Sequence, residues 1–264
     1  DCDFSTSGDI VFYSEWIDFL KETTIKDPME RRGVDQNLWI WEQADYSREY
    51  MVVADVARGD SKDYSAFHII DIENCTQVAE FKDQIPTKDF GRILYNIANE
   101  YNKALLVIEN ANIGWAVIQE VIDRQYQNLY YSYRELGYID EDIHLRKGWD
   151  LKRKEDMVPG FTMSSRTRPL VVSKLDTYMR ERTPIIHSKR LIDELFVFVW
   201  NGSRAEAQRG YNDDLVMSFS TGLWVRDTAL KLRQQGIDLS RTALTHITKT
   251  SGGVYNSRTH DDNP

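Results

Sequence analysis

Alternating and continuous apolar runs predict a set of closely spaced strands in the first half of the chain. Segments 50–55, 64–71 and about 75–83 each have the length and pattern of a strand. The short polar connection "IENC" between the second and third segments is typical of a hairpin. We therefore expect these three strands to form an antiparallel meander.

Helical periodicity begins after this meander. In "PTKDFGRILYNIANEYN" the apolar positions recur at helical spacing, and Thr87 is the expected N-cap. An apolar strand over 104–110, a helix over about 114–126 and a short strand "LYYSY" follow. The order β-β-β-α-β-α-β predicts an α/β fold: a mixed sheet flanked by helices on both faces. Its later strands should pair in parallel through right-handed crossovers.

The C-terminal half shows mainly helical patterns. A helix is expected near 169–182, a second over "SKRLIDELFVFVW", and a long third that has Asn212 or Asp213 as its cap. The inner face of the third helix should carry Leu215, Phe219 and Leu223, which follow one another at intervals of four.

Length and local composition suggest one large domain with extensions at both ends. The chain has 264 residues. We expect a lead-in or linker over 1–48, the folded domain over 49–235 and a loose, polar C-terminal tail over 236–264. The first residue is not Met and the N-terminus is not a signal sequence, so we expect a fragment of a longer protein. No apolar run approaches the roughly 20 residues of a membrane span, so no membrane partner is expected.

The charge distribution adds one feature to this picture. The formal net charge is −9, which does not favour a nucleic-acid binder, and the two cysteines suit a reducing, intracellular environment. However, residues 146–190 contain twelve Lys or Arg against five Asp or Glu. This basic stretch lies before the last helix, and it is either a solvated face or an arm that binds a polyanion.

Acidic residues follow two of the predicted apolar strands and open the last helix. Asp55 ends "VVAD", Glu109 ends "LVIE", and Asp213 and Asp214 stand in "NDDLV". Ligand sites in α/β sheets form beyond strand ends and at helix N-termini. If the strands of Asp55 and Glu109 are neighbours, their carboxylates lie side by side and the Asp pair can complete the cluster.

Carboxylates held this close together repel one another unless a proton or a cation intervenes. Hard oxygen ligands suit Mg²⁺ or Mn²⁺, and two such ions about 4 Å apart can activate water and stabilise the leaving oxygen of a phosphodiester. Asp63 is a further candidate ligand, from the second strand. The alternative is structural, since Asp after a strand is often a turn former and Asp213 or Asp214 can cap a helix.

The sequence lacks the motifs of several other catalytic classes. The chain contains no GxxxxGK[ST] phosphate loop, no GxSxG and no HExxH. ATP hydrolysis by this chain alone is therefore not expected. His68, on the second strand, is expected to be a packed or surface residue rather than a metal ligand.

Four segments together resemble a known family. They are "MVVADVARGDSKDYSAFHIID", "LLVIENANIGW", "PGFTMSSRTRPLVVSKL" and "EAQRGYNDDLVMSFSTGLW", and they resemble the C-terminal nuclease domain of tailed-bacteriophage large terminase subunits, closest to the T-even-like branch. The resemblance covers about residues 1–235, and "DCDFSTSGDIVF" is similar to the segment that closes the preceding ATPase domain. It implies an RNase H-like fold with a basic arm inserted before the last helix.

The resemblance also implies roles for single residues. Asp55 matches the first catalytic Asp and Glu109 the second acid. Asp213 and Asp214 match the third position; the motif leaves open which is the main ligand, with a slight preference for Asp214. Asn212 stands where the family often has His. The implied cofactor is Mg²⁺ or Mn²⁺, as two ions.

The implied activity is metal-dependent endonuclease cutting of concatemeric viral double-stranded DNA during packaging. The implied partners are DNA, the portal protein, the small terminase subunit and the chain's own ATPase domain, at the prohead portal in the cytoplasm of an infected bacterium. The residues expected to contact DNA phosphates are Arg58, Lys152, Arg153, Lys154, Arg166 and Arg168. Alternatives are another RNase H-like nuclease, such as a junction resolvase or a hybrid nuclease, and a non-catalytic portal-docking domain.

Overall fold

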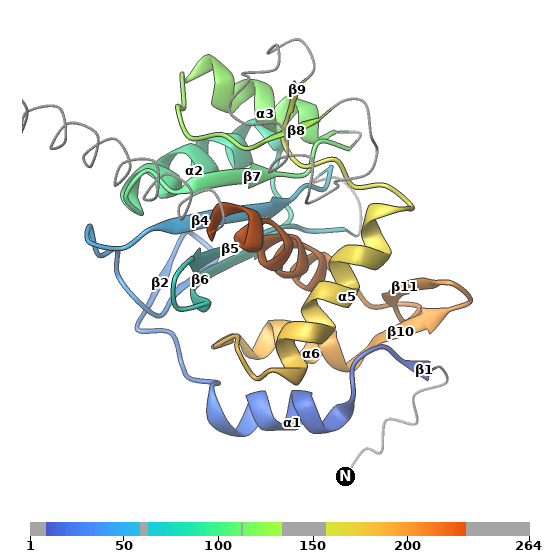
Figure 1. The fold of residues 1–264 in the computed structure, drawn as a ribbon. Coiled ribbons are helices and arrows are strands. Elements are labelled where there is room, and N and C mark those ends of the chain that lie inside the picture. Colours follow the sequence, from blue (N-terminus) through green and yellow to red (C-terminus); the bar gives the residue numbers. More distant parts are fainter. Residues whose placement is uncertain (1–8, 59–62, 112, 134–156, 231–264) are drawn as a thin grey trace, which may run out of the picture. The chain divides into compact units, whose positions relative to one another are not determined.

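A computed structural model describes residues 9–58, 63–111, 113–133 and 157–230 (Figure 1). The chain divides into two compact units, Asp1–Arg226 and Asp227–Pro264. The first unit contains every candidate site residue.

The first unit is built on a mixed six-stranded sheet with the order β2-β3-β6-β5-β4-β7. Its strands are β2 (Glu30–Arg32), β3 (Leu38–Ile40), β4 (Tyr50–Asp55), β5 (Ser65–Asp71), β6 (Thr76–Asp83) and β7 (Leu105–Ile108). Strands β4, β5 and β6 form the predicted antiparallel meander, and β7 pairs with β4 in parallel, also as predicted. Strand β4 lies between β5 and β7 and is buried on both faces, which explains its continuous apolar run.

The sheet extends further toward the N-terminus than the predicted first strand at residue 50. Strand β3 pairs with β6, and β2 pairs with β3, so part of the expected lead-in belongs to the sheet. Leu38 and Ile40 are buried, and the amide of Trp41 donates to the carbonyl of Val78 at 2.8 Å. These strands have only three residues each, too few for an alternating pattern to be recognised in sequence.

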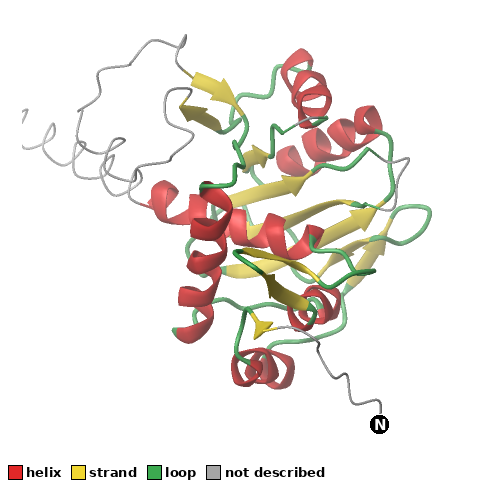
Figure 2. Cartoon of the chain, turned by 90° about the vertical axis from the view of Figure 1, so that its right-hand side faces the viewer, coloured by secondary structure: helices red, strands yellow, loops and turns green. Residues whose placement is uncertain are grey.

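Helices cover both faces of the sheet, as predicted (Figures 1 and 2). One face carries α2 (Thr87–Glu100) and α3 (Gly114–Asp123). The other carries α5 (Thr167–Arg180), α6 (Lys189–Phe196) and the long helix that begins at residue 214. Helix α1 (Ser14–Thr23) lies against α6.

The core follows the alternation of side chains along β4. Val52 and Ala54 point toward α2 and α3, where they meet Phe90, Leu94 and Val117. Because successive strand residues point to opposite faces, Val53 and Asp55 point toward the helix that begins at residue 214. The alternation thus directs Asp55 toward the helix that carries Asp214.

Two element boundaries differ from the predictions. The N-cap of α2 is Pro86, and Thr87 is the first helical residue; no side chain caps this end. The helix predicted over "SKRLIDELFVFVW" ends at Phe196, and β10 (Phe198–Asn201) follows. The β-branched and aromatic residues of "FVFVW" suit a strand, which a long apolar run hides in the sequence.

Smaller sheets complete the unit. Strand β10 pairs with β11 (Arg204–Ala207) and with β1 (Asp9–Ile10). Strands β8 (Tyr131–Tyr133) and β9 (Met157–Pro159) form a two-stranded sheet. Within the described parts of the chain, none of the helices has the length and apolar character that crossing a bilayer requires.

Candidate active site

The parallel pairing of β4 and β7 brings the first two predicted acids together. Ala54 pairs with Ile108, and the amide of Glu109 donates to the carbonyl of Ala54 at 3.0 Å. Asp55 and Glu109 therefore leave the sheet side by side, as the sequence predicts. The two carboxyl groups are close enough that, after burial, the charge of Glu109 raises the pKa of Asp55.

Close backbone packing fixes the position of Glu109. Its chain forms an isolated parallel bridge with Phe161. Helix α3 begins so near that a Cβ on Gly114 would lie 1.9 Å from the carbonyl oxygen of Glu109. Only glycine can occupy this first helical position without moving the strand end.

The acidic pair lies at the start of the long helix. The amide of Met217 donates to the carbonyl of Asp213 at 2.8 Å, so Asp213 occupies the N-cap position, one of the two that the sequence allowed. Its side chain, however, forms a hydrogen-bonded ion pair with Arg168. Arg168 is oriented in turn by a bond from its Nε to the carbonyl of Ala205 at 3.1 Å.

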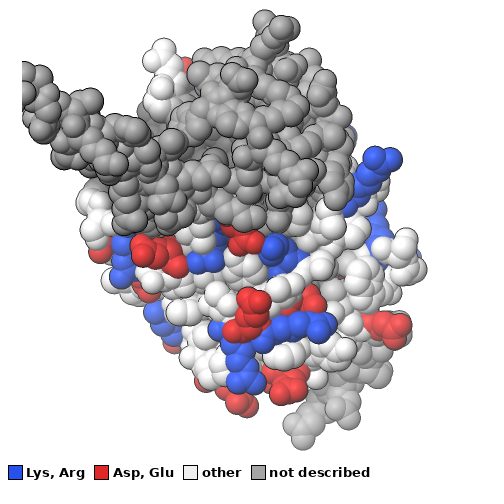
Figure 3. Space-filling model, in the orientation of Figure 1, with Lys and Arg blue, Asp and Glu red and all other residues white. Residues whose placement is uncertain are grey.

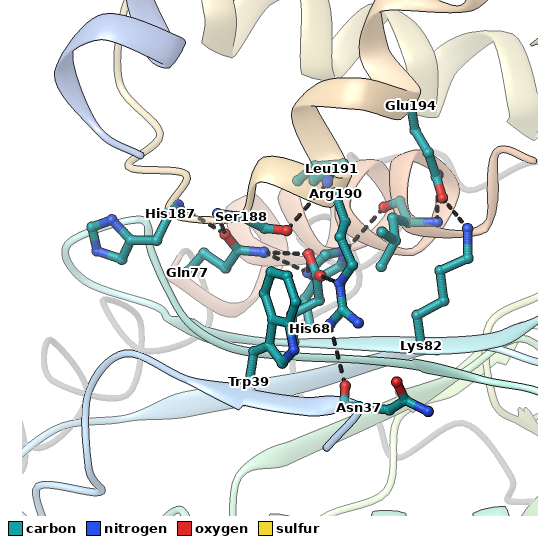
Figure 4. A network of polar contacts seen from close by, with 12 residues as sticks. Asn37, Trp39, His68, Gln77, Lys82, His187, Ser188, Arg190, Leu191 and Glu194 are labelled. Carbon is teal, nitrogen blue, oxygen red and sulfur yellow. Dashed lines mark hydrogen bonds and ion pairs between the residues drawn. The ribbon is translucent and has the colours of Figure 1, made fainter. Parts of the chain in front are cut away.

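Glu194, from α6, replaces Asp213 as the side-chain cap of this helix. Its Oε2 accepts from the amides of Leu215 at 2.9 Å and Val216 at 3.2 Å. Its Oε1 accepts from the ammonium group of Lys82, which reaches up from β6 (Figure 4). The network thereby joins the sheet, α6 and the helix that begins at residue 214.

Asp214 is the most enclosed member of the acidic pair. Its side chain is 14% exposed, and the backbone N–H of Tyr64 donates to it. Its Oδ2 is buried and has no hydrogen-bond partner among the described residues, although the Nζ of Lys82 lies 3.9 Å away. A buried carboxylate oxygen normally has a bonding partner, and a proton, a water molecule or a cation can fill this role.

The carboxyl groups perturb one another's ionisation. Burial, and then the charges of Glu109, Asp214 and Asp213, raise the pKa of Asp55 well above its usual value. Burial also raises the pKa of Glu109, against the hydrogen bond to Asp55 and the charge of Arg168. It raises the pKa of Asp214 to about 6 although Lys82 opposes the shift. The four acids therefore form one electrostatic unit that favours a bound proton or cation.

The donor set fits a hard divalent ion. No three His, Cys, Asp or Glu side chains among the described residues already converge at ligand distances. This result agrees with the mutual effect of the acids on their pKa values, because charges act over longer distances than metal–ligand bonds. In addition, the side chain of Asp213 is turned toward Arg168. Asp55, Glu109 and Asp214 offer only carboxylate oxygens, the ligands that Mg²⁺ and Mn²⁺ prefer, and the bare Oδ2 of Asp214 is available.

The other predicted site residues lie at different distances from this cluster. Asp63 is exposed, and its charge raises the pKa of Asp214, which places it near the edge of the cluster. Arg58 is exposed in the loop after β4, and Arg166 is exposed at the N-cap of α5. Lys152, Arg153 and Lys154 lie outside the described residues.

Figure 3 shows the described charges on one face of the molecule. Basic and acidic side chains are interspersed there, and the described atoms form no continuous basic surface on this face. His68 is buried, so of the two expected positions, packed or at the surface, it occupies the packed one.

Two residues of the site were not predicted from the sequence. Lys82 is the last residue but one of β6, and Glu194 lies in an amphipathic helix; charged residues at such positions are usually solvated. The one signal was the placement of Glu194 between Leu191 and Leu195, which share its buried helix face.

No protein-family model matches the chain. Among solved structures it is similar to the large terminase nuclease from thermophilic phage G20c, with bound cobalt and with bound magnesium. Each of these two matches has a TM-score of 0.59 and 19% sequence identity, and each covers 81% of this chain and 96% of that chain. It is also similar to the Thermus phage P74-26 large terminase nuclease domain, with a TM-score of 0.57, 21% identity, and coverage of 80% of this chain and 93% of that chain. The mixed sheet and its flanking helices are therefore arranged as in the fold of these phage large terminase nucleases, in agreement with the fold that the resemblance implies.

Proposed function

We propose that this chain is the metal-dependent DNA endonuclease domain of a viral DNA-packaging terminase. The observation that carries the proposal is the side-by-side placement of Asp55 and Glu109 by the parallel β4–β7 pair, with Asp213 and Asp214 in the same electrostatic cluster. The fold supports it, because the similar G20c nuclease structures contain bound magnesium and bound cobalt.

The cofactor in this proposal is Mg²⁺ or Mn²⁺, bound as two ions. When bound, such ions activate a water molecule for attack on a phosphodiester and stabilise the leaving oxygen. Asp55, Glu109 and Asp214 would hold them, with Asp213 available once it separates from Arg168.

The chain's own residues prepare the cluster for this task. Strands β4 and β7 hold Asp55 and Glu109 on rigid backbone. Burial removes water that would otherwise screen the carboxylates, and this strengthens their attraction for a divalent cation. Arg168 and Lys82 limit the repulsion within the cluster before a cation binds.

The substrate we propose is concatemeric double-stranded DNA, which this domain would cut and also engage during translocation into the prohead. The basic residues Arg58 and Arg166, with Lys152, Arg153 and Lys154 outside the described residues, would contact phosphates. Such contacts depend on salt and are largely insensitive to sequence. The portal protein, the small terminase subunit and a preceding ATPase domain are the proposed partners, at the portal in the cytoplasm of the host.

A direct test compares the 264-residue chain with its Asp55→Asn variant on supercoiled plasmid DNA. We expect Mg²⁺- or Mn²⁺-dependent nicking and linearisation by the parent, and loss of both in the variant. Preferential cutting of four-way junctions or RNA–DNA hybrids over linear duplex would instead indicate another RNase H-like nuclease. A parent that binds no metal and cuts none of these substrates would favour a docking domain and contradict the proposal.

A further inference from the structure

Lys82 lies between two carboxylates, those of Glu194 and Asp214. Its ammonium group donates to Glu194 and lies 3.9 Å from the Oδ2 of Asp214. The Lys82 side chain is only 16% exposed, and its Nζ also lies 4.8 Å from the centroid of the Tyr64 ring. A cation in this position interacts with both acids, but its hydrogen bond goes to Glu194.

Glu194 holds Lys82 with one oxygen and the long helix with the other. Its Oε2 accepts from the amides of Leu215 and Val216, which directly follow Asp214. Glu194 is 7% exposed, so both of its contacts are made in surroundings where charge interactions are strong. It therefore sets the position of the helix start and of the lysine at the same time.

We propose that Glu194 is a positioning residue that retains Lys82 and thereby keeps Asp214 available to a divalent cation. The inference rests on the proposed function, because it assumes that Asp214 is a metal ligand. Without the charge of Glu194, the nearest carboxylate to Lys82 among the described residues is Asp214. Lys82 would then pair with Asp214 and compete with the metal ion for it.

Capping alone does not explain a glutamate at this position. Helix N-termini are usually capped by a short side chain at the N-cap itself, where this chain has Asp213. Glu194 reaches the helix from α6 instead, and it brings a full charge to the side of Asp214 where Lys82 lies. A glutamine could accept the same two amide bonds through its one carbonyl oxygen, but it would not hold the lysine by charge.

This difference gives an experiment that separates positioning from folding. The parent chain and the variants Glu194→Gln, Lys82→Met and Lys82→Met/Glu194→Gln are titrated with Mn²⁺ without DNA, by calorimetry and by the thermal shift that Mn²⁺ produces. Circular dichroism checks that each variant is folded. We expect Glu194→Gln to bind Mn²⁺ about tenfold more weakly than the parent, since about 1.4 kcal/mol of added competition corresponds to tenfold.

The double variant is the matched control. Removing Lys82 together with the charge of Glu194 removes the competitor, so Mn²⁺ affinity should return to within about threefold of the parent. Lys82→Met alone should bind Mn²⁺ at least as tightly as the parent, because it adds no competitor and removes a positive charge.

Two results would overturn the inference while leaving the proposed function intact. One is parent-like Mn²⁺ affinity in folded Glu194→Gln. The other is equally weak binding in Glu194→Gln and in the double variant, which would mean that Glu194 acts through the fold and not through Lys82. Failure of the proposed function looks different: the parent itself would bind no Mn²⁺ and cut no DNA, and the inference would fall with it.

Discussion

The ring of His68, in the middle of the sheet, is joined to the backbone carbonyl of Leu215, in the first turn after the acidic pair, by a hydrogen bond of 3.0 Å. The Nε2 atom must carry the proton to donate to a carbonyl, so Nδ1 is free to accept from the amide of Gln77 at 2.9 Å. This arrangement requires neutral His68, and burial correspondingly lowers the pKa of its ring. The sheet thus anchors the helix that carries Asp214.

The first prediction concerns the pH dependence of this anchor. His68→Phe keeps a ring of similar shape but leaves the carbonyl of Leu215 without its donor, at a cost of about 1–3 kcal/mol in unfolding free energy at pH 8. The folded-state pKa of His68 is lowered, so its contribution is complete above the unfolded-state pKa of about 6.5 and decreases as the pH falls below that value.

The stability difference between parent and His68→Phe should therefore shrink between pH 7.5 and pH 5. Urea unfolding of both proteins at several pH values measures it. His187, whose pKa burial also lowers, is present in both proteins and cancels in the difference. A difference that stays constant with pH would contradict a neutral, buried His68.

The second prediction concerns the stability cost of the carboxylate cluster. Without metal, Asp55→Asn should stabilise the chain by about 1–2 kcal/mol at pH 8, because it removes one buried negative charge from a repelling set. The raised pKa of Asp55 means that the parent loses stability as the pH rises from about 4 through this pKa, so the gain from the substitution should be small at pH 4.

Thermal unfolding with and without Mg²⁺ at both pH values tests this prediction. Mg²⁺ should raise the melting temperature of the parent and leave that of Asp55→Asn nearly unchanged. Asp89→Asn, on the exposed start of α2 where Asp89 pairs with Arg92, is the matched control and should keep the metal response. Destabilisation by Asp55→Asn without metal would show that the cluster is held together by bonds rather than strained by charge.

The third prediction concerns the backbone contact that positions Glu109. Gly114→Ala adds a Cβ that would lie 1.9 Å from the carbonyl oxygen of Glu109, so the strand end or the helix must move. We expect a stability loss of about 1–3 kcal/mol. Displacement of a catalytic carboxylate by about 1 Å should lower cleavage by about 100-fold.

Gly202→Ala is the control for a glycine substitution as such. Gly202 has φ +61° in an exposed turn, and no atom lies within 4 Å of its added Cβ. The left-handed backbone should cost about 1 kcal/mol of stability, but cleavage by the folded protein should match the parent. Equal cleavage by folded Gly114→Ala and the parent would show that Glu109 is not held by this contact.

Part of the site follows from the sequence because short-range patterns determine it. The side-by-side placement of Asp55 and Glu109 needs only two strands of recognisable pattern and a right-handed crossover between them, and the parallel β4–β7 pair confirms it. The position of Asp213 at a helix start likewise depends on a few neighbouring residues.

Other features could not be predicted because they join residues far apart in the chain. Lys82 and Glu194 are separated by 112 positions, and Arg168 and Asp213 by 45. Nothing in the local pattern of either segment indicates which charge will meet which. Strand β10 was misjudged for a different reason: an apolar run that directly continues a helix reads equally well as more helix.

The last prediction separates two arginines that the sequence treats alike. Arg166 is exposed at the start of α5, whereas Arg168 is 17% exposed and is bound to Asp213 and to the carbonyl of Ala205. If Arg166 contacts a phosphate, Arg166→Ala should weaken DNA binding uniformly across sequences and reduce the slope of log affinity against log salt by about 1. Fluorescence anisotropy with a duplex, from 50 to 200 mM salt and with Ca²⁺ in place of Mg²⁺, measures this slope.

Arg168→Ala should behave differently, because its charge is already engaged inside the site. The salt slope should stay that of the parent, while the metal-free chain loses about 1–3 kcal/mol of stability as Asp213 loses its partner. Arg92→Ala, on α2 at the opposite face of the sheet, should change neither the slope nor the metal response. A reduced slope in Arg168→Ala would mean that Arg168 leaves Asp213 when DNA binds, and an unchanged slope in Arg166→Ala would remove Arg166 from the proposed DNA contacts.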